Sequence, residues 1–522
     1  MIRLFVSILR HALRDQSGQT LPLFAAGLLA LLAISGLSVD LGHAYVVHSQ
    51  LVASTDAAAL AAAQSITLSG SAFDPQAVVN AWGAGTNGKN YPGLSTATAT
   101  VQSLCLTSLL PNGITKCTSA SGVNAVRVTQ TTSAPTYFLK ALGFSSIPMS
   151  ATATAALRIT PWNVAIVMDA TGSMTTIDSN CTKSPTRFQC AMTGIQTLLG
   201  GANPCPPGMA TCTDSAAIFR VSLFAFPNVS NDTVSYASNC GGSLNYDKYT
   251  LPVSNGTSYG PITYSQSSPT PASWTATYQI VGFSSDYYSP SSSNGLNTGS
   301  PLVKAVTGCM QPIVSPGTGT GGLNGASSGG ITYFAGALYA AQAALEQEQQ
   351  QYPQSQNAII FLSDGQANLY AKTGDFPTAY TVNPSLGLSA LTGTGSYPDA
   401  TDECQQAIAA AQAAAQAGTR VYGIAYGSEQ SGCTSASGGT DSAIVINSSS
   451  LNAPLPSLNA LTPCVTIEDI ASAESYFYSD YNQSGSGSTC QSQSHQITQL
   501  SDIFGDILTS LTKAILVPNT AT

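Results

Sequence analysis

The hydrophobic pattern divides this chain into a long apolar segment near its start and a later series of short apolar runs. Residues 16–39 carry no charge and consist mainly of Leu, Ala, Gly and Ser. This length matches the roughly 20 residues that a membrane-spanning helix needs. Three arginines precede the segment, so the positive-inside rule places residues 1–15 in the cytoplasm and the chain from Asp40 onward outside. A signal peptide is the alternative, but its apolar core spans only about 7–15 residues, so we expect an uncleaved anchor.

Beyond the anchor, the helical pattern continues through an Ala-rich stretch to about residue 68. Residues 70–160 then mix short β-like runs with a short helix. The Thr/Ala alternation in Ser150–Leu157 is typical of a strand. We therefore expect a small α+β region before the main domain, with strands at 96–101, 125–129 and 151–159 and a helix at 137–142.

From residue 161 onward, apolar runs that are typical of buried strands alternate with helical patterns. This alternation is the signature of a doubly wound, mostly parallel α/β sheet. Residues 228–328, rich in Ser, Asn, Gly, Pro, Thr and Tyr, and the smaller segment 428–463 interrupt it, and we interpret both as insertions. The predicted strands lie at 163–168, 218–226, 358–362, 419–427 and 475–478, and the predicted helices at 188–199, 332–350, 404–417 and 497–515.

The main candidate for chemistry is a polar loop after the first strand of this sheet. Asp169-x-Thr171-x-Ser173 places one carboxylate and two hydroxyls on alternate residues, at the carboxyl end of a strand, where open α/β sheets bind ligands. A second apolar strand leads to Asp364, and Thr332 supplies a hydroxyl just before an apolar-rich helix. Oxygen ligands without His or Cys are those that Mg²⁺ or Mn²⁺ prefers. The sequence therefore predicts a divalent-metal site.

These three loops resemble the metal-ion-dependent adhesion site of the von Willebrand factor A (vWA) domain. That family reads Asp-x-Ser-x-Ser, then a Thr, then an Asp, on loops above a parallel sheet. This chain departs from the pattern in having Thr171 for the usual Ser and in having Ile331 between a Gly pair and the following Thr. The resemblance implies a vWA fold over residues 161–515 and a metal-ligand set of Asp169, Thr171, Ser173, Thr332 and Asp364.

The segment that follows the anchor carries a second resemblance. Val39-Asp40-Leu41-Gly42, then Gln50-Leu51, then an Ala-rich run from Asp56 is similar to the N-terminal segment of TadE/TadG-like proteins of the tight-adherence (Flp) pilus system. The resemblance implies a bacterial inner-membrane protein with a periplasmic bulk and with pilus-assembly components as partners. The Gly18-Gln19 junction is similar to a prepilin cleavage point, but Leu23 stands where prepilins carry Glu.

Composition and cysteine usage agree with export. Charged residues make up only 8% of the chain, against roughly 25% in typical soluble proteins. A net charge of −9 argues against a nucleic-acid partner, which would need a basic face. All twelve cysteines follow the anchor, which indicates disulfides in an oxidising compartment. Sequence leaves their connectivity open, but close spacings favour the pairs Cys105/Cys117, Cys181/Cys190 and Cys205/Cys212, with Cys240 and Cys309 as ends of a larger loop.

We expect a binding protein rather than an enzyme, with no catalytic residue. Of four His, only His495 lies in the main domain, so the positioned base that Ser or Cys nucleophiles need is missing. The favoured interpretation is metal-dependent protein binding in Flp pilus assembly or anchoring. The alternatives are a membrane-anchored adhesin for a host or matrix protein, and a structural envelope protein with an inert metal site. Partner identity, oligomeric state and the choice of metal stay open.

Overall fold

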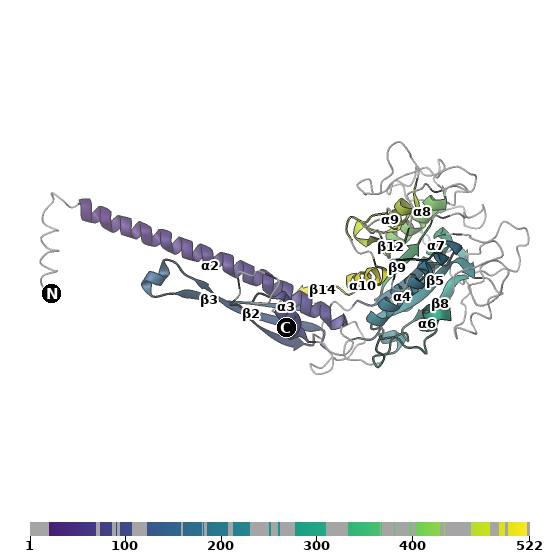
Figure 1. The fold of residues 1–522 in the computed structure, drawn as a ribbon, viewed down its shortest axis with the longest axis horizontal. Coiled ribbons are helices and arrows are strands. Elements are labelled where there is room, and N and C mark those ends of the chain that lie inside the picture. Colours follow the sequence, from purple (N-terminus) through teal and green to yellow (C-terminus); the bar gives the residue numbers. More distant parts are fainter. Residues whose placement is uncertain are drawn as a thin grey trace, which may run out of the picture.

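The computed structural model describes most of the chain, in separate stretches. Within them the chain forms a long helix, a small antiparallel sheet beside it and an α/β domain (Figure 1). The described residues are 20–68, 74–85, 90, 94, 96–106, 123–157, 160–179, 181, 185–206, 212–229, 250–251, 259–261, 277–309, 332, 334–365, 367, 380–381, 396–397, 403–427, 433, 461–480, 490–495 and 499–518.

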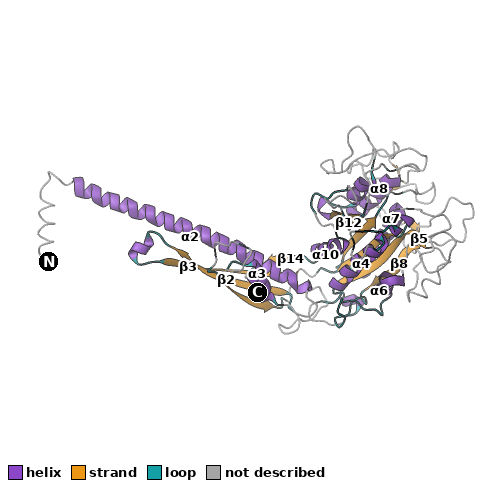
Figure 2. Cartoon of the chain, viewed as in Figure 1, coloured by secondary structure: helices purple, strands orange, loops and turns teal. Residues whose placement is uncertain are grey.

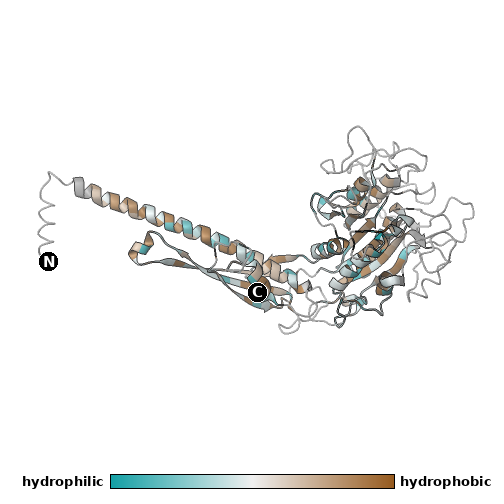
Figure 3. Ribbon diagram, in the orientation of Figure 1, coloured by the Kyte–Doolittle hydropathy of each residue, from teal (hydrophilic) through white to brown (hydrophobic). Residues whose placement is uncertain are grey.

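Helix α2 (Thr20–Leu68) is one uninterrupted element of 49 residues, as the sequence pattern predicts. The side chains of residues 24–35 are all exposed, and Figure 3 shows hydrophobic colours along this part of the helix. A helix that is apolar on every side is typical of a membrane span. Within the described stretches, only the helix over Phe24–Ile66 is long and apolar enough to cross a membrane, judged by length and composition.

From Gly36 onward, one stripe of α2 is covered by the following small domain. Asp40, Ser54 and Thr55 are its buried polar residues, and Thr55 Oγ1 donates to Gln130 Oε1 of the small sheet at 3.0 Å. The stripe repeats every three or four residues, the spacing of one helix face. The buried positions of α2 are Gly36, Asp40, Ala44, Val47, Leu51, Ser54, Thr55, Ala58, Ala59, Ala62 and Ala63.

The small domain is a four-stranded antiparallel sheet, in agreement with the predicted α+β region. Figure 2 shows its β2–β3 hairpin running beside α2, with a short helical turn at the tip. The predicted strands are present but longer than expected, because pairing extends the hairpin beyond the alternating segment. The elements are α3 (Pro75–Trp82), β1 (Thr98–Leu104), β2 (Ala125–Pro135), the turn η3 (Leu139–Leu142), β3 (Ser146–Leu157) and β14 (Ala514–Val517).

The predicted closing helix is wrong at its end, where the chain forms the last strand of that sheet. Helix α10 (Leu500–Leu511) ends four residues before the predicted end at Ile515, and β14 pairs with β3 instead. Trp162 Nε1 donates to the carbonyl of Leu511 at 3.0 Å, which satisfies one terminal carbonyl of the helix. Gln64 Nε2 then donates to Thr512 Oγ1 at 3.2 Å, and its Oε1 accepts from Ala514 N at 2.9 Å. These contacts tie the end of the α/β domain to α2.

The α/β domain is built on a six-stranded sheet in the order β13-β12-β9-β4-β5-β8. All neighbours are parallel except β8, which runs antiparallel at one edge. This confirms the predicted doubly wound, mostly parallel α/β sheet. The strands are β4 (Trp162–Asp169), β5 (Phe219–Val229), β8 (Thr277–Ser284), β9 (Gln356–Ser363), β12 (Arg420–Ala425) and β13 (Phe477–Ser479).

Strand β8 corrects the interpretation of residues 228–328 as an insertion, because it belongs to the sheet itself. Its buried Gln279 donates from Nε2 to Ser222 Oγ at 3.0 Å, and Ser222 Oγ donates to the carbonyl of Val281 at 2.7 Å. Polar side chains inside this strand pair with its neighbour, so the strand lacks the apolar run that identifies the others. The domain boundaries themselves stay predictions.

Helices cover both faces of this sheet (Figure 1). Alternate residues of β4 point to opposite sides, so Ile166 packs into one core and Val167 into the other. The first core holds α4 (Arg187–Gly201), α6 (Pro301–Lys304) and α10, and the second holds α7 (Phe334–Gln351), α8 (Glu403–Gln416) and the unpredicted α9 (Pro463–Ile470). The remaining short elements are η4 (Gly172–Thr175), η5 (Asp214–Ala216), β6 (Thr250–Leu251), β7 (Tyr259–Pro261), η7 (Ala305–Cys309), β10 (Tyr380–Thr381), β11 (Ser396–Tyr397) and η10 (Glu474–Tyr476).

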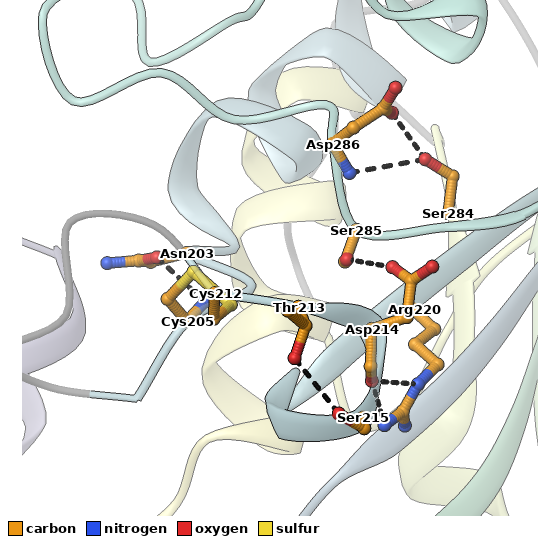
Figure 4. Close-up of a disulfide and its surroundings, with 10 residues drawn as sticks. All are labelled: Asn203, Cys205, Cys212, Thr213, Asp214, Ser215, Arg220, Ser284, Ser285 and Asp286. Carbon is orange, nitrogen blue, oxygen red and sulfur yellow. Dashed lines mark hydrogen bonds between the residues drawn. A yellow bond between two sulfur atoms is a disulfide. The ribbon is translucent and has the colours of Figure 1, made fainter.

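Disulfides close loops of the α/β domain, and no cysteine in the described stretches is free. Figure 4 shows Cys205–Cys212, which leads into Asp214; the carbonyl of Asp214 accepts from Arg220 Nε of β5 at 2.9 Å. Cys117 and Cys240, members of two expected pairs, lie outside the described residues, although Cys105 is disulfide-bonded. The described bridges are Cys181–Cys190 and Cys205–Cys212, both as predicted, and Cys404–Cys433 and Cys464–Cys490.

Candidate metal centre

Two neighbouring parallel strands bring the two predicted acids together. Strands β4 and β9 pair in register from Trp162↔Gln356 to Met168↔Leu362, so their carboxyl ends meet at one edge of the sheet. Asp169 is the last residue of β4, and Asp364 follows β9 directly. Both acids are buried, with exposed fractions of 0% and 4%. This edge is where open α/β sheets bind ligands.

Hydroxyl groups surround the Asp169 carboxylate. Its Oδ1 accepts from the backbone N–H of Thr171 at 2.8 Å and from Thr171 Oγ1 at 2.6 Å. Its Oδ2 accepts from Ser363 Oγ at 2.6 Å. Buried polar groups need such partners, and the alternating spacing of Asp169 and Thr171 lets the loop fold back onto its own carboxylate.

A chain of hydroxyls links the two acids. Thr171 Oγ1 and Ser173 Oγ lie 2.9 Å apart, and Ser173 Oγ donates to Asp364 Oδ1 at 2.6 Å. Thr332 is also buried, just before α7 begins at Phe334. The structure therefore brings Asp169, Thr171, Ser173 and Asp364 into one hydrogen-bonded cluster. The role of these four residues and of Thr332 as metal ligands stays a prediction.

The cluster is short of positive charge. Burial first, and then the nearby charge of Asp364, raise the pKa of Asp169 to about 7 despite the lowering effect of the Ser363 and Thr171 hydrogen bonds. Two buried carboxyls in one site disfavour each other's ionised form. A cation at this place would relieve both effects.

Arg187 supplies one such cation and is not among the site residues predicted from the sequence. Its Nη1 lies 3.0 Å from Asp364 Oδ2, with the Arg187 side chain 25% exposed and that of Asp364 fully buried. Arg187 begins α4 after the N-cap Thr186, whose capping box with Gln189 sets the helix start. A cation in the first turn of a helix is disfavoured by the helix dipole. The position of Arg187 in the first turn of α4 therefore indicates a specific acidic partner, and this signal is present in the sequence.

Two further acids lie at the same edge, beyond Arg187. Tyr426 Oη donates to Asp178 Oδ2 at 2.6 Å, and the backbone N–H of Gly427 donates to Asp480 Oδ1 at 2.7 Å. Burial raises the pKa of Asp480 to about 6, although the Gly427 N–H and Arg187 act to lower it. Gly427 has φ +63° and abuts the Arg187 guanidinium, where a Cβ would lie 2.6 Å from it, so glycine is required at this turn.

The donor set fits a hard divalent cation. Among the described residues, no group of three or more His, Cys, Asp or Glu is placed to hold a metal, so a metal here would need hydroxyl ligands as well as the two carboxylates. Oxygen-only sets of this kind suit Mg²⁺ or Mn²⁺ and not zinc or copper. The chemistry of the cluster is therefore compatible with the predicted metal.

Comparison with solved structures gives weak similarities to pilus proteins. The pilus adhesin SpaC from Lactobacillus rhamnosus GG matches 80% of this chain and 35% of its own, at 10% identity and a TM-score of 0.33. The adhesive tip pilin GBS104 from Group B Streptococcus agalactiae matches 59% and 40%, at 13% identity and a TM-score of 0.23. This chain thus spans less than half of either protein, and similarities at this level carry no argument about its site or function.

Comparison with protein families is informative for the N-terminal part. No curated protein matches the chain. Residues 18–65 match the family described as putative Flp pilus-assembly TadE/G-like, and residues 47–155 match the family described as putative Tad-like Flp pilus-assembly. These ranges contain α2 and most of the small antiparallel sheet, including the segment that carries the resemblance noted from the sequence. The N-terminal part of this chain, residues 18–155, is therefore similar to the TadE/G-like and Tad-like Flp pilus-assembly families.

Proposed function

We propose that this chain is a single-pass protein of the bacterial inner membrane that acts in Flp pilus assembly or anchoring through metal-dependent protein binding. Its N-terminus faces the cytoplasm, and the small sheet and the α/β domain lie in the periplasm. Three observations support membrane attachment with the bulk outside the cytoplasm. They are the family matches over residues 18–155, the apolar helix α2 and the disulfides. Other pilus-assembly components are the expected partners.

The hydrogen-bonded cluster at the carboxyl ends of β4 and β9 carries the binding proposal. Asp169 and Asp364 would hold Mg²⁺ or Mn²⁺ together with the hydroxyls of Thr171, Ser173 and Thr332. The chain's own residues already stand close to one another, with hydroxyl-to-carboxylate distances of 2.6 Å on both acids, so little rearrangement is needed to converge on one ion. When bound, the cation supplies a positive charge that an acidic side chain of a partner protein can approach.

The ion pair of Arg187 with Asp364 supports a second candidate, a structural site. A guanidinium at 3.0 Å from Asp364 Oδ2 neutralises one buried acid without any metal. In that case the cluster pins the loops after β4 and β9, and the α/β domain contributes to the envelope as scaffold. The two candidates differ in whether a divalent cation competes with Arg187.

Affinity capture of the full-length protein from native envelopes tests the proposal. The unaltered chain, Asp169→Asn and the control Asp502→Asn, an exposed acid on α10, are compared in Mg²⁺ and in chelator. We expect pilus-assembly components to be recovered with the unaltered chain and the control in Mg²⁺, and to be lost with chelator or with Asp169→Asn.

Capture that is indifferent to chelator and to Asp169→Asn would contradict metal-dependent binding and favour the scaffold candidate. Deletion strains then separate assembly from attachment. Loss of surface fibres supports the assembly role, whereas intact fibres with reduced attachment to host or matrix protein indicate an adhesin.

A further inference from the structure

The tip of the β2–β3 hairpin, residues 136–145, exposes large apolar side chains. Tyr137, Phe138, Leu142 and Phe144 have exposed fractions of 61%, 55%, 74% and 64%. Soluble surfaces scatter such residues singly, and a contiguous group marks an interaction site. Lys140 is the only charged residue in this tip.

The tip is fixed to helix α2 by a buried carboxylate. Asp40 accepts hydrogen bonds from the backbone N–H groups of Tyr137 at 2.7 Å, Phe138 at 3.0 Å and Leu139 at 2.6 Å. These donors lie at the start of the turn η3, where the free N–H groups of a helical turn favour an anion. The tip therefore has a defined position along α2.

Close packing at Gly36 also fixes the position of the tip along α2. A Cβ at Gly36 would lie 2.7 Å from a ring carbon of Phe138, so the ring lies directly against the helix backbone. His43 Nδ1 lies 3.2 Å from the carbonyl of Pro135, at the base of the tip. The tip thus lies beside residues 36–43 of α2 and cannot slide along the helix without losing these contacts.

The level of the tip coincides with the end of the predicted membrane span. The part of α2 from Thr20 to Val39 is about 30 Å long at 1.5 Å per residue, which matches the hydrocarbon core of a bilayer, about 30 Å thick. The last turn of the span, which contains Gly36, therefore lies at the boundary between acyl chains and headgroups. Phe138 packs on that turn, so the tip lies at the same depth.

The exposed side of α2 near this level is also apolar. Leu37, Leu41 and Tyr45 follow one another at helical spacing with exposed fractions of 43%, 54% and 76%. Tyrosine and lysine are typical of membrane interfaces, where the ring lies at headgroup level and the ammonium meets anionic lipid. Tyr137 and Lys140 of the tip match this pattern.

We propose that the hairpin tip inserts into the outer-leaflet interface of the membrane that α2 spans, with lipid as its partner. Tyr137, Leu142 and Phe144 contact acyl chains and glycerol groups, and Lys140 contacts the phosphates. Together with α2, the tip forms a second membrane contact that restrains the tilt and rotation of the small sheet relative to the bilayer. This inference does not depend on the metal site.

Fluorescence quenching in lipid nanodiscs tests this contact. The full-length protein is reconstituted at one copy per disc, with lipids brominated near the glycerol end of the acyl chains. Phe144→Trp is compared with Ile177→Trp, a residue of the α/β domain with a similar exposed fraction of 68%. The unaltered protein, which has three Trp, supplies the background.

We expect Phe144→Trp to show blue-shifted emission and a loss of intensity with brominated lipid, and Ile177→Trp to show neither. Adding Asp40→Ala to Phe144→Trp releases the tip and reduces the quenching. Equal quenching of the two Trp variants would overturn the proposal. So would a blue shift that appears only at several copies per disc, because it would identify the tip as a contact between chains.

Discussion

Ser173 donates a hydrogen bond to Asp364 at 2.6 Å although the two residues are 191 positions apart in the chain. The contact exists because β4 and β9 are adjacent in the sheet and end at the same edge. It joins the Asp169 loop to the Asp364 loop and defines the cluster on which the binding proposal rests. The first two predictions concern this cluster.

Replacing either acid should weaken divalent-metal binding sharply. Asp169→Asn and Asp364→Asn each remove one of the two charges that a hard cation needs, so we expect Mg²⁺ or Mn²⁺ affinity to fall by at least about tenfold. Mn²⁺ titration followed by electron paramagnetic resonance measures this, with Asp502→Asn as the matched control. Unchanged affinity in Asp364→Asn would mean that this residue is not a ligand.

Arg187→Gln should distinguish metal-dependent binding from the purely structural role of the cluster. Without metal, the change leaves Asp364 without its ion-pair partner, and we expect a loss of about 1–3 kcal/mol in the free energy of unfolding. With saturating Mg²⁺, the metal replaces the missing charge, so the loss should shrink and the apparent metal affinity should rise. Thermal unfolding in chelator and in Mg²⁺ measures both effects. A loss that is equal in the two conditions favours the scaffold.

Asp480 should make the protein less stable as pH rises from about 4 to 6. Its pKa is raised to about 6 in the folded protein from 3.8, chiefly by burial. Below pH 3.8 the carboxyl is protonated in both states and costs nothing, whereas above pH 6 it is ionised in both states and the full cost applies. A shift of this size corresponds to at most about 3 kcal/mol.

Asp480→Asn keeps the acceptor for the Gly427 N–H and removes the charge. We therefore expect this variant to be more stable than the unaltered protein at pH 7.5, with the difference shrinking towards pH 4. Denaturant unfolding of the detergent-solubilised chain across this range measures the difference. A variant that is less stable at pH 7.5 would mean that Arg187 already compensates the charge of Asp480.

Gln64 should control how firmly the chain end is held on the small sheet. Gln64→Leu removes the acceptor for Ala514 N and the donor to Thr512, so we expect local opening of β14 to become easier by about 1–2 kcal/mol. Hydrogen exchange of the amides in Ala514–Val517 measures this. Ser65→Ala is the control, because the Ser65 hydroxyl donates to Ala62 O on its own helix, and it should leave that exchange unchanged.

Local sequence patterns predict much of the fold. The uninterrupted apolar segment determines α2, and the buried runs that become β4 and β9 are recognisable because each is covered on both faces. The Asp169-x-Thr171-x-Ser173 loop and Asp364 can be placed at strand ends for the same reason. Local loop closures such as Cys181–Cys190 follow from short spacing alone.

The tertiary structure decided what depends on pairing between distant segments. The buried Gln279 of β8 donates to Ser222 of the neighbouring strand β5, and β14 forms by pairing with the edge of β3. Arg187 at the start of α4 and the acids Asp178 and Asp480 lie at the site because the folded sheet brings their segments together. A membrane contact can be inferred for the exposed apolar residues of the hairpin tip only because Asp40 fixes them beside the end of the membrane span. A hydrophobic pattern determines which face of an element is buried, whereas the identity of the neighbour that buries it is a property of the whole fold.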